Sequence, residues 1–103
     1  MSTHTLEMTD LIANYFKTQP VLKAWLFGSF SRGEETPDSD VDILVRYDKN
    51  ARISLMTISH MMGMLEKVLN RRVDLVEEGC LIPSAAESAN RDKILIYERE
   101  NKG

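Results

Sequence analysis

The sequence predicts an α/β (α+β) domain in which helices flank a small mixed β-sheet of about four strands. Two observations lead to this prediction. Short apolar segments bounded by glycine or proline alternate with longer segments whose apolar residues recur at helical spacing. Their order along the chain, helix-strand-strand-helix-strand-helix-strand, is typical of helices layered on a sheet.

The composition fits one small domain spanning residues 1–103. Hydrophobic residues make up 43% of the chain, which is enough for a core. The net charge of -3 gives no general attraction to nucleic acid or to an anionic membrane, so neither is an expected partner. Cys80 is the single cysteine, no signal peptide is evident, and no apolar run approaches the roughly 20 residues that cross a bilayer. We expect a cytoplasmic protein.

The first predicted helix covers residues 5–19 and ends before Pro20. Its large apolar residues lie near one helical face: Leu6, Leu11, Ile12, Tyr15 and Phe16. The segment "VLKAWLFG" (21–28) follows as a short buried strand, and residues 29–39 form a polar connection.

The second predicted strand is "DVDILVRY" (40–47), in which apolar and acidic residues alternate. Val41, Ile43 and Val45 face one side of the sheet, and Asp40, Asp42 and Leu44 face the other. How this strand pairs with the first is left open, because the connection between them is long.

The second half of the chain predicts a long helix, a strand, a short helix and a last strand. Residues 53–70 carry an apolar stripe at helical spacing: Leu55, Ile58, Met61, Met62, Leu65, Val68 and Leu69. "RRVDLVEEG" (71–79) reads as a strand. Ser84 and Glu87 form a predicted capping box for a helix that ends near residue 92. "KILIYE" (93–98) is then an edge strand or a continuation of that helix.

Asp40 and Asp42 place two carboxylates on the same face of a strand. Like charges this close repel, and a divalent cation relieves the repulsion. Mg²⁺ prefers oxygen ligands and commonly joins carboxylates to substrate phosphates. Asp74 lies in another apolar strand, where a carboxylate needs a partner. If the two strands are neighbours, three carboxylates converge at one end of the sheet.

Gly28 and Ser29 close the first strand and indicate a phosphate site. A glycine at the end of a buried strand allows a ligand to approach the backbone. The backbone amides of a helical turn that begins near Ser29, together with its hydroxyl, are donors for phosphate oxygens. A phosphate site joined to a metal site by a short polar loop indicates phosphoryl or nucleotidyl transfer.

The stretch "GSFSRGEETPDSDVDILV" (28–45) resembles the signature of the DNA-polymerase-β-like nucleotidyltransferases. That signature is a glycine-serine pair followed, after a spacer, by two aspartates that flank one residue. The fuller match, "RG" before "SDVD", resembles the minimal nucleotidyltransferases, which are often the antitoxin half of HEPN–MNT pairs. The short chain and the later "RRVDLV" fit the same group.

This resemblance implies that Gly28, Ser29, Arg32 and Ser39 bind ATP. An acceptor oxygen would attack the α-phosphorus and pyrophosphate would leave. The chain lacks the extra helical domain of larger relatives. The implied acceptor is therefore a hydroxyl, in the family a tyrosine, of a partner HEPN toxin, and the protein would act as an antitoxin.

The resemblance also assigns catalytic and metal-binding roles to the three aspartates. Asp40 and Asp42 would bind two Mg²⁺ ions. Asp74 would complete the nearer metal site and help to activate the attacking hydroxyl. A homo-oligomer and a hetero-oligomer both remain open.

Several alternatives stay open at this point. Asp40 and Asp42 could lie in a turn with solvated charges, and Arg32 could be a solvated loop cation. Asp74 could pair with Arg71 or Arg72 on an edge strand. The chain could also be a non-catalytic antitoxin that neutralises its toxin by complex formation, or could transfer the nucleotide to a small molecule.

Overall fold

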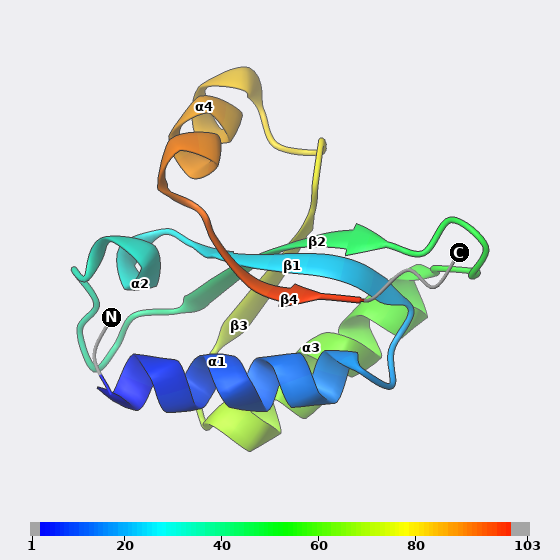
Figure 1. Cartoon of the computed structure of the whole chain (residues 1–103), viewed down its shortest axis with the longest axis horizontal. Coiled ribbons are helices and arrows are strands. Elements are labelled where there is room, and N and C mark those ends of the chain that lie inside the picture. The colour runs from blue at the N-terminus through cyan, green and yellow to red at the C-terminus, as the bar shows by residue number, and fades with distance from the viewer. Residues whose placement is uncertain (1–2, 100–103) are drawn as a thin grey trace.

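Four helices and four strands alternate along residues 3–99, which are the residues described by the computed structural model (Figure 1). The ends of the predicted domain, residues 1–2 and 100–103, lie outside the described part. The elements are, in chain order, α1 (Thr3–Phe16), β1 (Val21–Phe27), α2 (Ser29–Arg32), β2 (Val41–Tyr47), α3 (Leu55–Leu69), β3 (Val73–Glu77), α4 (Pro83–Asp92) and β4 (Ile94–Glu98).

The strands form one mixed sheet in the order β3-β2-β1-β4. Strand β1 pairs antiparallel with β2 and with β4, whereas β2 and β3 are parallel. The sheet that the sequence predicts is therefore confirmed. Its last strand lies at an edge and does not continue the helix before it. The parallel pair has its crossover through α3, as such a pair requires.

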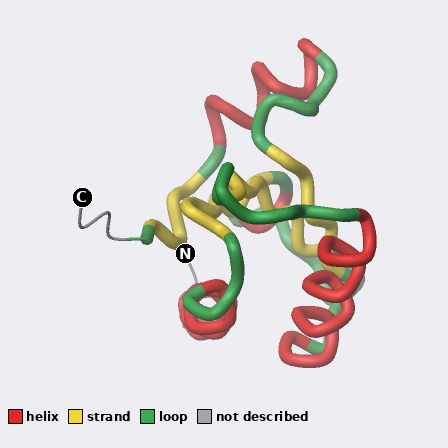
Figure 2. Tube along the Cα trace, turned by 90° about the vertical axis from the view of Figure 1, so that its right-hand side faces the viewer, coloured by secondary structure: helices red, strands yellow, loops and turns green. Residues whose placement is uncertain are grey.

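Helices α1 and α3 cover one face of the sheet, and α4 lies on the other side (Figures 1 and 2). The main core lies between the sheet and the first two of these helices. It includes Phe16, Leu26, Ile43 and Leu65, all fully buried. The alternation of β2 is confirmed, because Val41, Ile43 and Val45 all belong to this core.

A smaller apolar cluster lies under α4, on the opposite face of the sheet. Trp25 and Leu44 pack there against Ala89 of the helix. The Trp25 ring also has two cations over it, with Arg46 Cζ 5.5 Å and Lys93 Nζ 4.6 Å from the ring centroid. Apolar contact with one short helix thus covers only part of this face.

The face that α1 buries differs from the predicted one. Leu6 and Leu11 are 48% and 46% exposed, and the sheet is contacted instead by Thr5, Met8, Thr9, Ile12 and Phe16. The burial of a threonine is tolerated because its hydroxyl is bonded. The Thr9 Oγ1 donates to the Leu6 carbonyl oxygen at 2.8 Å. The prediction considered large apolar residues only, and it therefore missed that Thr5 and Thr9 belong to the buried face of α1.

Helix α3 buries the middle of its predicted stripe but not its start. Met61 and Leu65 are fully buried, whereas Leu55 is 83% exposed and Val68 is 43% exposed. The helix begins with a capping box, in which the Ser54 hydroxyl accepts from the Thr57 N–H.

The predicted capping box of Ser84 and Glu87 is wrong. Helix α4 begins at Pro83, its N-cap is Ile82, and no side chain caps it. Proline is favoured at the first helical position because its fixed φ suits the helix and its missing N–H needs no partner. Within residues 3–99, no helix is long and apolar enough to span a membrane.

Two leucines of α3 test this description of the core. Leu65→Ala should lower the free energy of unfolding by about 2–5 kcal/mol, because it opens a cavity under the sheet. Leu55→Ala on the same helix should change it by less than about 0.5 kcal/mol. Urea denaturation of both variants measures the difference. Equal losses would contradict the burial of α3 described above.

Candidate active site

The register of the two parallel strands places Asp42 beside Asp74. These residues are directly paired across β2 and β3. Neighbouring strands lie about 4.8 Å apart, and paired residues project to the same side of the sheet. That side is the one on which α4 lies, since Leu44 of β2 and Val76 of β3 belong to the cluster under that helix. The two strands are therefore neighbours, which is the condition on which the sequence predicted that the carboxylates converge.

The charge on Asp42 is unfavourable in this position. The pKa of Asp42 is raised above its usual range, first by burial, then by the charges of Asp74 and Asp40. The guanidinium of Arg32 acts in the opposite direction and lowers that pKa. Asp42 is half-buried, whereas Asp40 and Asp74 are exposed. The fold thus brings three carboxylates and one cation within electrostatic reach of each other.

Gly28 lies against the Asp42 carboxylate. A Cβ atom at this glycine would stand 2.4 Å from Asp42 Oδ2, so the carboxylate would have to move to admit one. The residue also has φ 73° and ψ −150°, a backbone conformation that is essentially restricted to glycine. The backbone conformation therefore requires a glycine here, and the close approach of Asp42 adds to that preference. The absent side chain of Gly28 leaves room for the carboxylate, and the glycine backbone makes the turn from β1 into α2.

The turn that follows Gly28 is closed by its own hydrogen bonds. The Gly28 carbonyl oxygen accepts from the Ser31 N–H at 3.2 Å and from the Ser31 hydroxyl at 2.8 Å. Ser29 begins α2, is half-buried, and accepts a hydrogen bond from the Glu34 N–H through its carbonyl oxygen. The helical turn predicted at Ser29 is confirmed.

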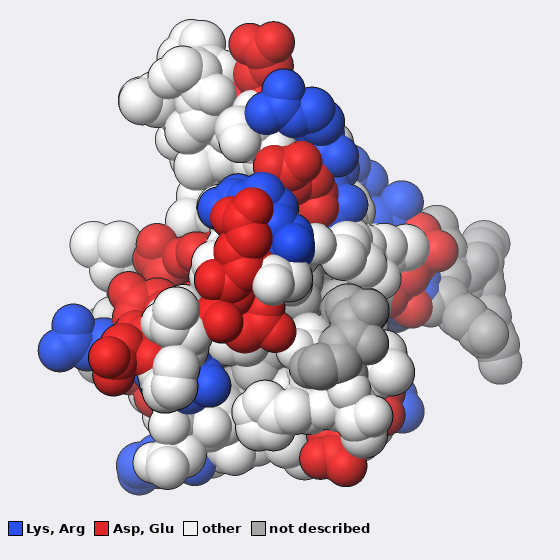
Figure 3. Space-filling view, turned by 90° about the vertical axis from the view of Figure 1, so that its left-hand side faces the viewer, with Lys and Arg blue, Asp and Glu red and all other residues white. Residues whose placement is uncertain are grey.

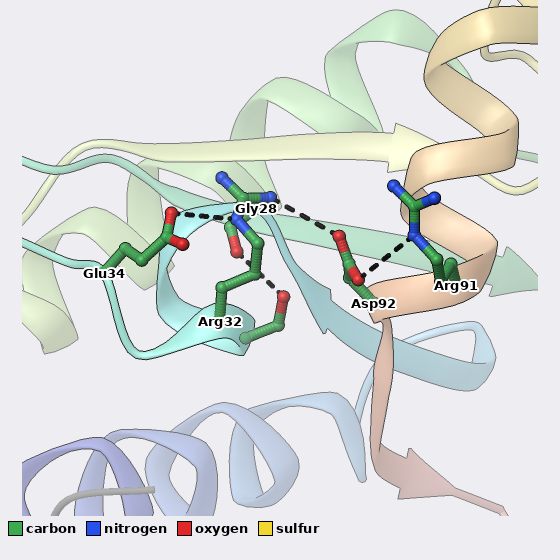
Figure 4. A network of polar contacts seen from close by, with 6 residues as sticks. Gly28, Arg32, Glu34, Arg91 and Asp92 are labelled. Atoms are coloured by element: carbon green, nitrogen blue, oxygen red, sulfur yellow. Dashed lines mark hydrogen bonds and ion pairs between the residues drawn. The ribbon is translucent and has the colours of Figure 1, made fainter.

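Arg32 connects this turn to α4. Its Nε lies 3.1 Å from Glu34 Oε2, and its Nη1 lies 3.7 Å from Asp92 Oδ2 (Figure 4). Asp92 also lies 3.7 Å from Arg91. Arg32 is therefore paired and is not a free loop cation. Asp92 and Glu34 are residues that sequence reasoning missed. Asp92 is 60 positions from Arg32, and no local pattern links them.

Ser39 has a structural bond in this arrangement. Its hydroxyl accepts from the Thr36 N–H at 2.8 Å and closes the loop before Asp40. Arg71 donates to the carbonyl oxygens of the same loop and not to Asp74. Among the described residues, Asp74 has no ion pair with Arg71 or with Arg72. The edge-strand alternative is thus half right, since β3 is an edge strand but Asp74 has no such partner.

The donor chemistry of this site fits a hard divalent cation. Asp40, Asp42 and Asp74 supply carboxylate oxygens, which Mg²⁺ prefers. Within residues 3–99, no three carboxylate, imidazole or thiol groups are gathered closely enough to hold an ion by themselves. Mg²⁺ is usually bound by one or two carboxylates together with substrate phosphates. The aspartates therefore fit a site that a phosphate-bearing substrate completes.

The surroundings of the site are open and acidic. Figure 3 shows acidic side chains gathered on the side of the molecule where α2 lies, with basic side chains among them. A cavity of about 410 Å³ adjoins Asp40. It is lined by Pro37, Asp38, Ser39, Asp40, Asn70, Arg71 and Arg72. Of the three site aspartates, Asp40 lines this cavity, whereas Asp42 and Asp74 do not.

Comparison with protein families identifies one model that covers almost the whole chain. The model described as "Polymerase beta, Nucleotidyltransferase" matches residues 10–102. The curated relative named protein adenylyltransferase MntA, from Thermococcus cleftensis, is 34% identical over 93% of this chain and 100% of its own length.

Solved structures share the fold. A structure provisionally named a minimal nucleotidyltransferase is 30% identical, with a TM-score of 0.74 over 91% of this chain and 95% of its own. A toxin-antitoxin structure with AMP-PNP is 19% identical, with a TM-score of 0.74 over 89% and 74%. A tri-AMPylated Shewanella oneidensis HEPN toxin in complex with an MNT antitoxin is 18% identical, with a TM-score of 0.60 over 88% and 73%.

The contact between Gly28 and Asp42 can be tested with two glycines. Gly28→Ala should lower the free energy of unfolding by about 1–3 kcal/mol or more, through backbone strain and the clash with Asp42. Gly33 also has a positive φ, 70°, but nothing lies within 4 Å of its added Cβ. Gly33→Ala should therefore cost only about 1–2 kcal/mol of strain.

A double-mutant cycle isolates the clash. In an Asp42→Ala background the cost of Gly28→Ala should fall by about 0.5–3 kcal/mol, whereas the cost of Gly33→Ala should not change. Denaturation of the five variants and wild type gives both numbers. A cost of Gly28→Ala that is independent of residue 42 would contradict the contact.

Proposed function

The chain belongs to the polymerase β nucleotidyltransferase family, and we propose that it is a Mg²⁺-dependent protein adenylyltransferase that acts as an antitoxin. It would transfer AMP from ATP to a tyrosine hydroxyl of a partner HEPN toxin. The observation that carries this proposal is the pairing of Asp42 with Asp74 across parallel strands, with Gly28 packed against the Asp42 carboxylate.

The known proteins support the nucleotide and the partner. The relative MntA is named a protein adenylyltransferase. One structural neighbour is a toxin-antitoxin pair with AMP-PNP, and another contains an AMPylated HEPN toxin with its MNT antitoxin. These neighbours support ATP as the nucleotide and a HEPN toxin as the acceptor protein.

The end of β1 would hold the triphosphate. Gly28 leaves the backbone accessible next to Asp42, and Ser29 would donate its hydroxyl to a phosphate oxygen. Arg32 would exchange its bonds to Glu34 and Asp92 for bonds to phosphate, which carries more negative charge than either carboxylate. The Ser39 hydroxyl would bind the nucleotide after it releases the Thr36 N–H, or would act indirectly by holding the loop before Asp40 in place.

Asp40, Asp42 and Asp74 would hold two Mg²⁺ ions. When bound, Mg²⁺ would offset the carboxylate charges and stabilise negative charge on the attacking and leaving oxygens. Asp42 and Asp40 would face the phosphates. Asp74, which is exposed on the outermost strand, would lie toward the incoming acceptor and accept its hydroxyl proton. The acceptor oxygen would form a bond to the α-phosphorus, and the bond from that phosphorus to pyrophosphate would break.

The arrangement favours a catalytic antitoxin over one that acts by binding alone. Asp42 carries a raised pKa because burial and two neighbouring carboxylates disfavour its charge. A surface used only for binding gains nothing from like charges held together at a cost in stability. A site that binds cations and phosphate does gain from them.

Transfer of label from α-labelled ATP tests the proposal. The purified protein, Mg²⁺ and its partner toxin should yield label on the toxin. Asp42→Asn and Asp74→Asn should each lower the rate by roughly 100-fold or more, the scale of losing one group that stabilises transition-state charge. Asp10→Asn makes the same chemical change on an exposed position of α1 and should leave the rate unchanged.

Two outcomes would contradict the proposal. If a folded wild-type protein binds its toxin and transfers no label, neutralisation is by complex formation alone. If Asp42→Asn transfers label at the rate of Asp10→Asn, the reaction does not use this site. If the wild-type protein does label the toxin, mass spectrometry of the labelled toxin identifies the modified residue, which the proposal expects to be a tyrosine.

A further inference from the structure

Arg71 lies in the turn between α3 and β3 and contacts two other segments of the candidate site. Its Nη1 donates to the carbonyl oxygens of Thr36, Pro37 and Ser39, at 3.2, 3.2 and 3.1 Å. Its Cζ also lies 5.1 Å from the centroid of the Phe30 ring in α2. One side chain thus joins three segments that are distant in the sequence.

Each of these segments carries a proposed site residue. Phe30 is buried, and its neighbours in the sequence are Ser29 and Ser31. A ring held in place therefore also holds the turn that begins α2. The loop from Thr36 to Ser39 leads directly into Asp40. Arg71 itself stands three residues before Asp74. The contacts of Arg71 therefore set how the phosphate turn, the first aspartate pair and the third aspartate lie relative to one another.

The loop before Asp40 has few other anchors. Thr36 and Ser39 are joined by three hydrogen bonds: the Ser39 N–H donates to the Thr36 carbonyl oxygen at 3.0 Å, the Thr36 N–H donates to the Ser39 hydroxyl at 2.8 Å, and the two hydroxyls lie 3.3 Å apart. All three lie within the loop itself. The next anchor is the Val41 N–H, which donates to the Arg72 carbonyl oxygen at 2.9 Å. Just before the loop, the Thr5 hydroxyl of α1 donates to Glu35 Oε1 at 3.2 Å. Between Thr36 and Ser39, the side-chain bonds to other segments come from Arg71.

We propose that Arg71 is a positioning residue, which holds α2, the loop before Asp40 and the start of β3 in the arrangement that the active site needs. This inference rests on the proposed function of that site. The chemistry favours arginine, because a planar guanidinium can stack on an aromatic ring while it donates to several carbonyl oxygens. A lysine can donate to the carbonyl oxygens but cannot stack in the same way.

Arg72 provides a matched control. It is the same residue type at the next position, its side chain is exposed, and the described residues offer it no hydrogen-bond or ion-pair partner. Its one contact with the loop is made through the backbone carbonyl, which a side-chain substitution preserves. Arg72→Ala therefore removes the same charge from the same turn without removing the proposed anchor.

Amide hydrogen exchange measures the anchoring without any activity. Arg71→Ala should raise the exchange rate of the Thr36 and Ser39 amides by about tenfold or more, the effect of losing hydrogen bonds from a charged donor. Arg71→Lys should give a smaller increase, and Arg72→Ala should give none. Amides in the middle of β1 report global unfolding, and Arg71→Lys serves if the alanine variant is poorly folded.

Equal exchange at Thr36 and Ser39 in Arg71→Ala and Arg72→Ala would overturn the inference. The label-transfer assay adds the functional consequence. The Mg²⁺ concentration that gives half the maximal rate should rise about tenfold or more in Arg71→Ala and partly recover in Arg71→Lys. An unchanged Mg²⁺ dependence in Arg71→Ala would also overturn it. A wild-type protein that transfers no label would refute the proposed function, and the exchange rates would still decide whether Arg71 anchors the loop.

Discussion

The repulsion between Asp42 and its neighbouring carboxylates is the constraint around which the rest of the site is built. Parallel pairing of β2 with β3 places Asp74 directly beside Asp42, and the chain then buries part of the Asp42 carboxylate against Gly28. Both the neighbouring Asp74 and the burial make the charge on Asp42 less favourable, and both raise its pKa. The core under α1 and α3 supplies the stability that tolerates this arrangement, because the apolar residues of the same strands face those helices.

The nearby cations do not neutralise the aspartates directly. Arg32 lies close enough to lower the pKa of Asp42, yet its bonds go to Glu34 and Asp92. Arg71 donates its hydrogen bonds to carbonyl oxygens of the loop before Asp40. The site therefore keeps excess negative charge, which suits cations that arrive with a nucleotide. The ion pair of Arg32 with Asp92 also connects the turn after β1 to α4.

The sequence predicted the four strands and the family well, because both depend on short patterns. Alternation along β2 separates Asp42 from Ile43, and "GS" before "DVD" identifies the chemistry within 15 residues. Helix faces were predicted less well. Thr5 and Thr9 are buried in place of Leu6 and Leu11, since burial depends on how the helix lies on the sheet. Asp92 was missed altogether, and Arg71 was considered only as a partner of Asp74, because their contacts with Arg32 and with the loop exist only after the chain has folded. The catalytic and binding roles of all the site residues remain predictions: Gly28, Ser29, Arg32, Ser39, Asp40, Asp42 and Asp74.

The melting temperature of wild type and of Asp42→Asn, followed against pH with and without Mg²⁺, tests the central claim most directly. A carboxylate whose pKa is raised in the folded state destabilises that state as pH rises from its unfolded pKa through the raised folded value. At neutral pH without metal, the asparagine variant should therefore melt higher than wild type. The difference should shrink as the pH falls through that range, and Mg²⁺ should stabilise wild type more than the variant. A variant that melts lower than wild type at neutral pH, or equal stabilisation of both proteins by Mg²⁺, would contradict the account.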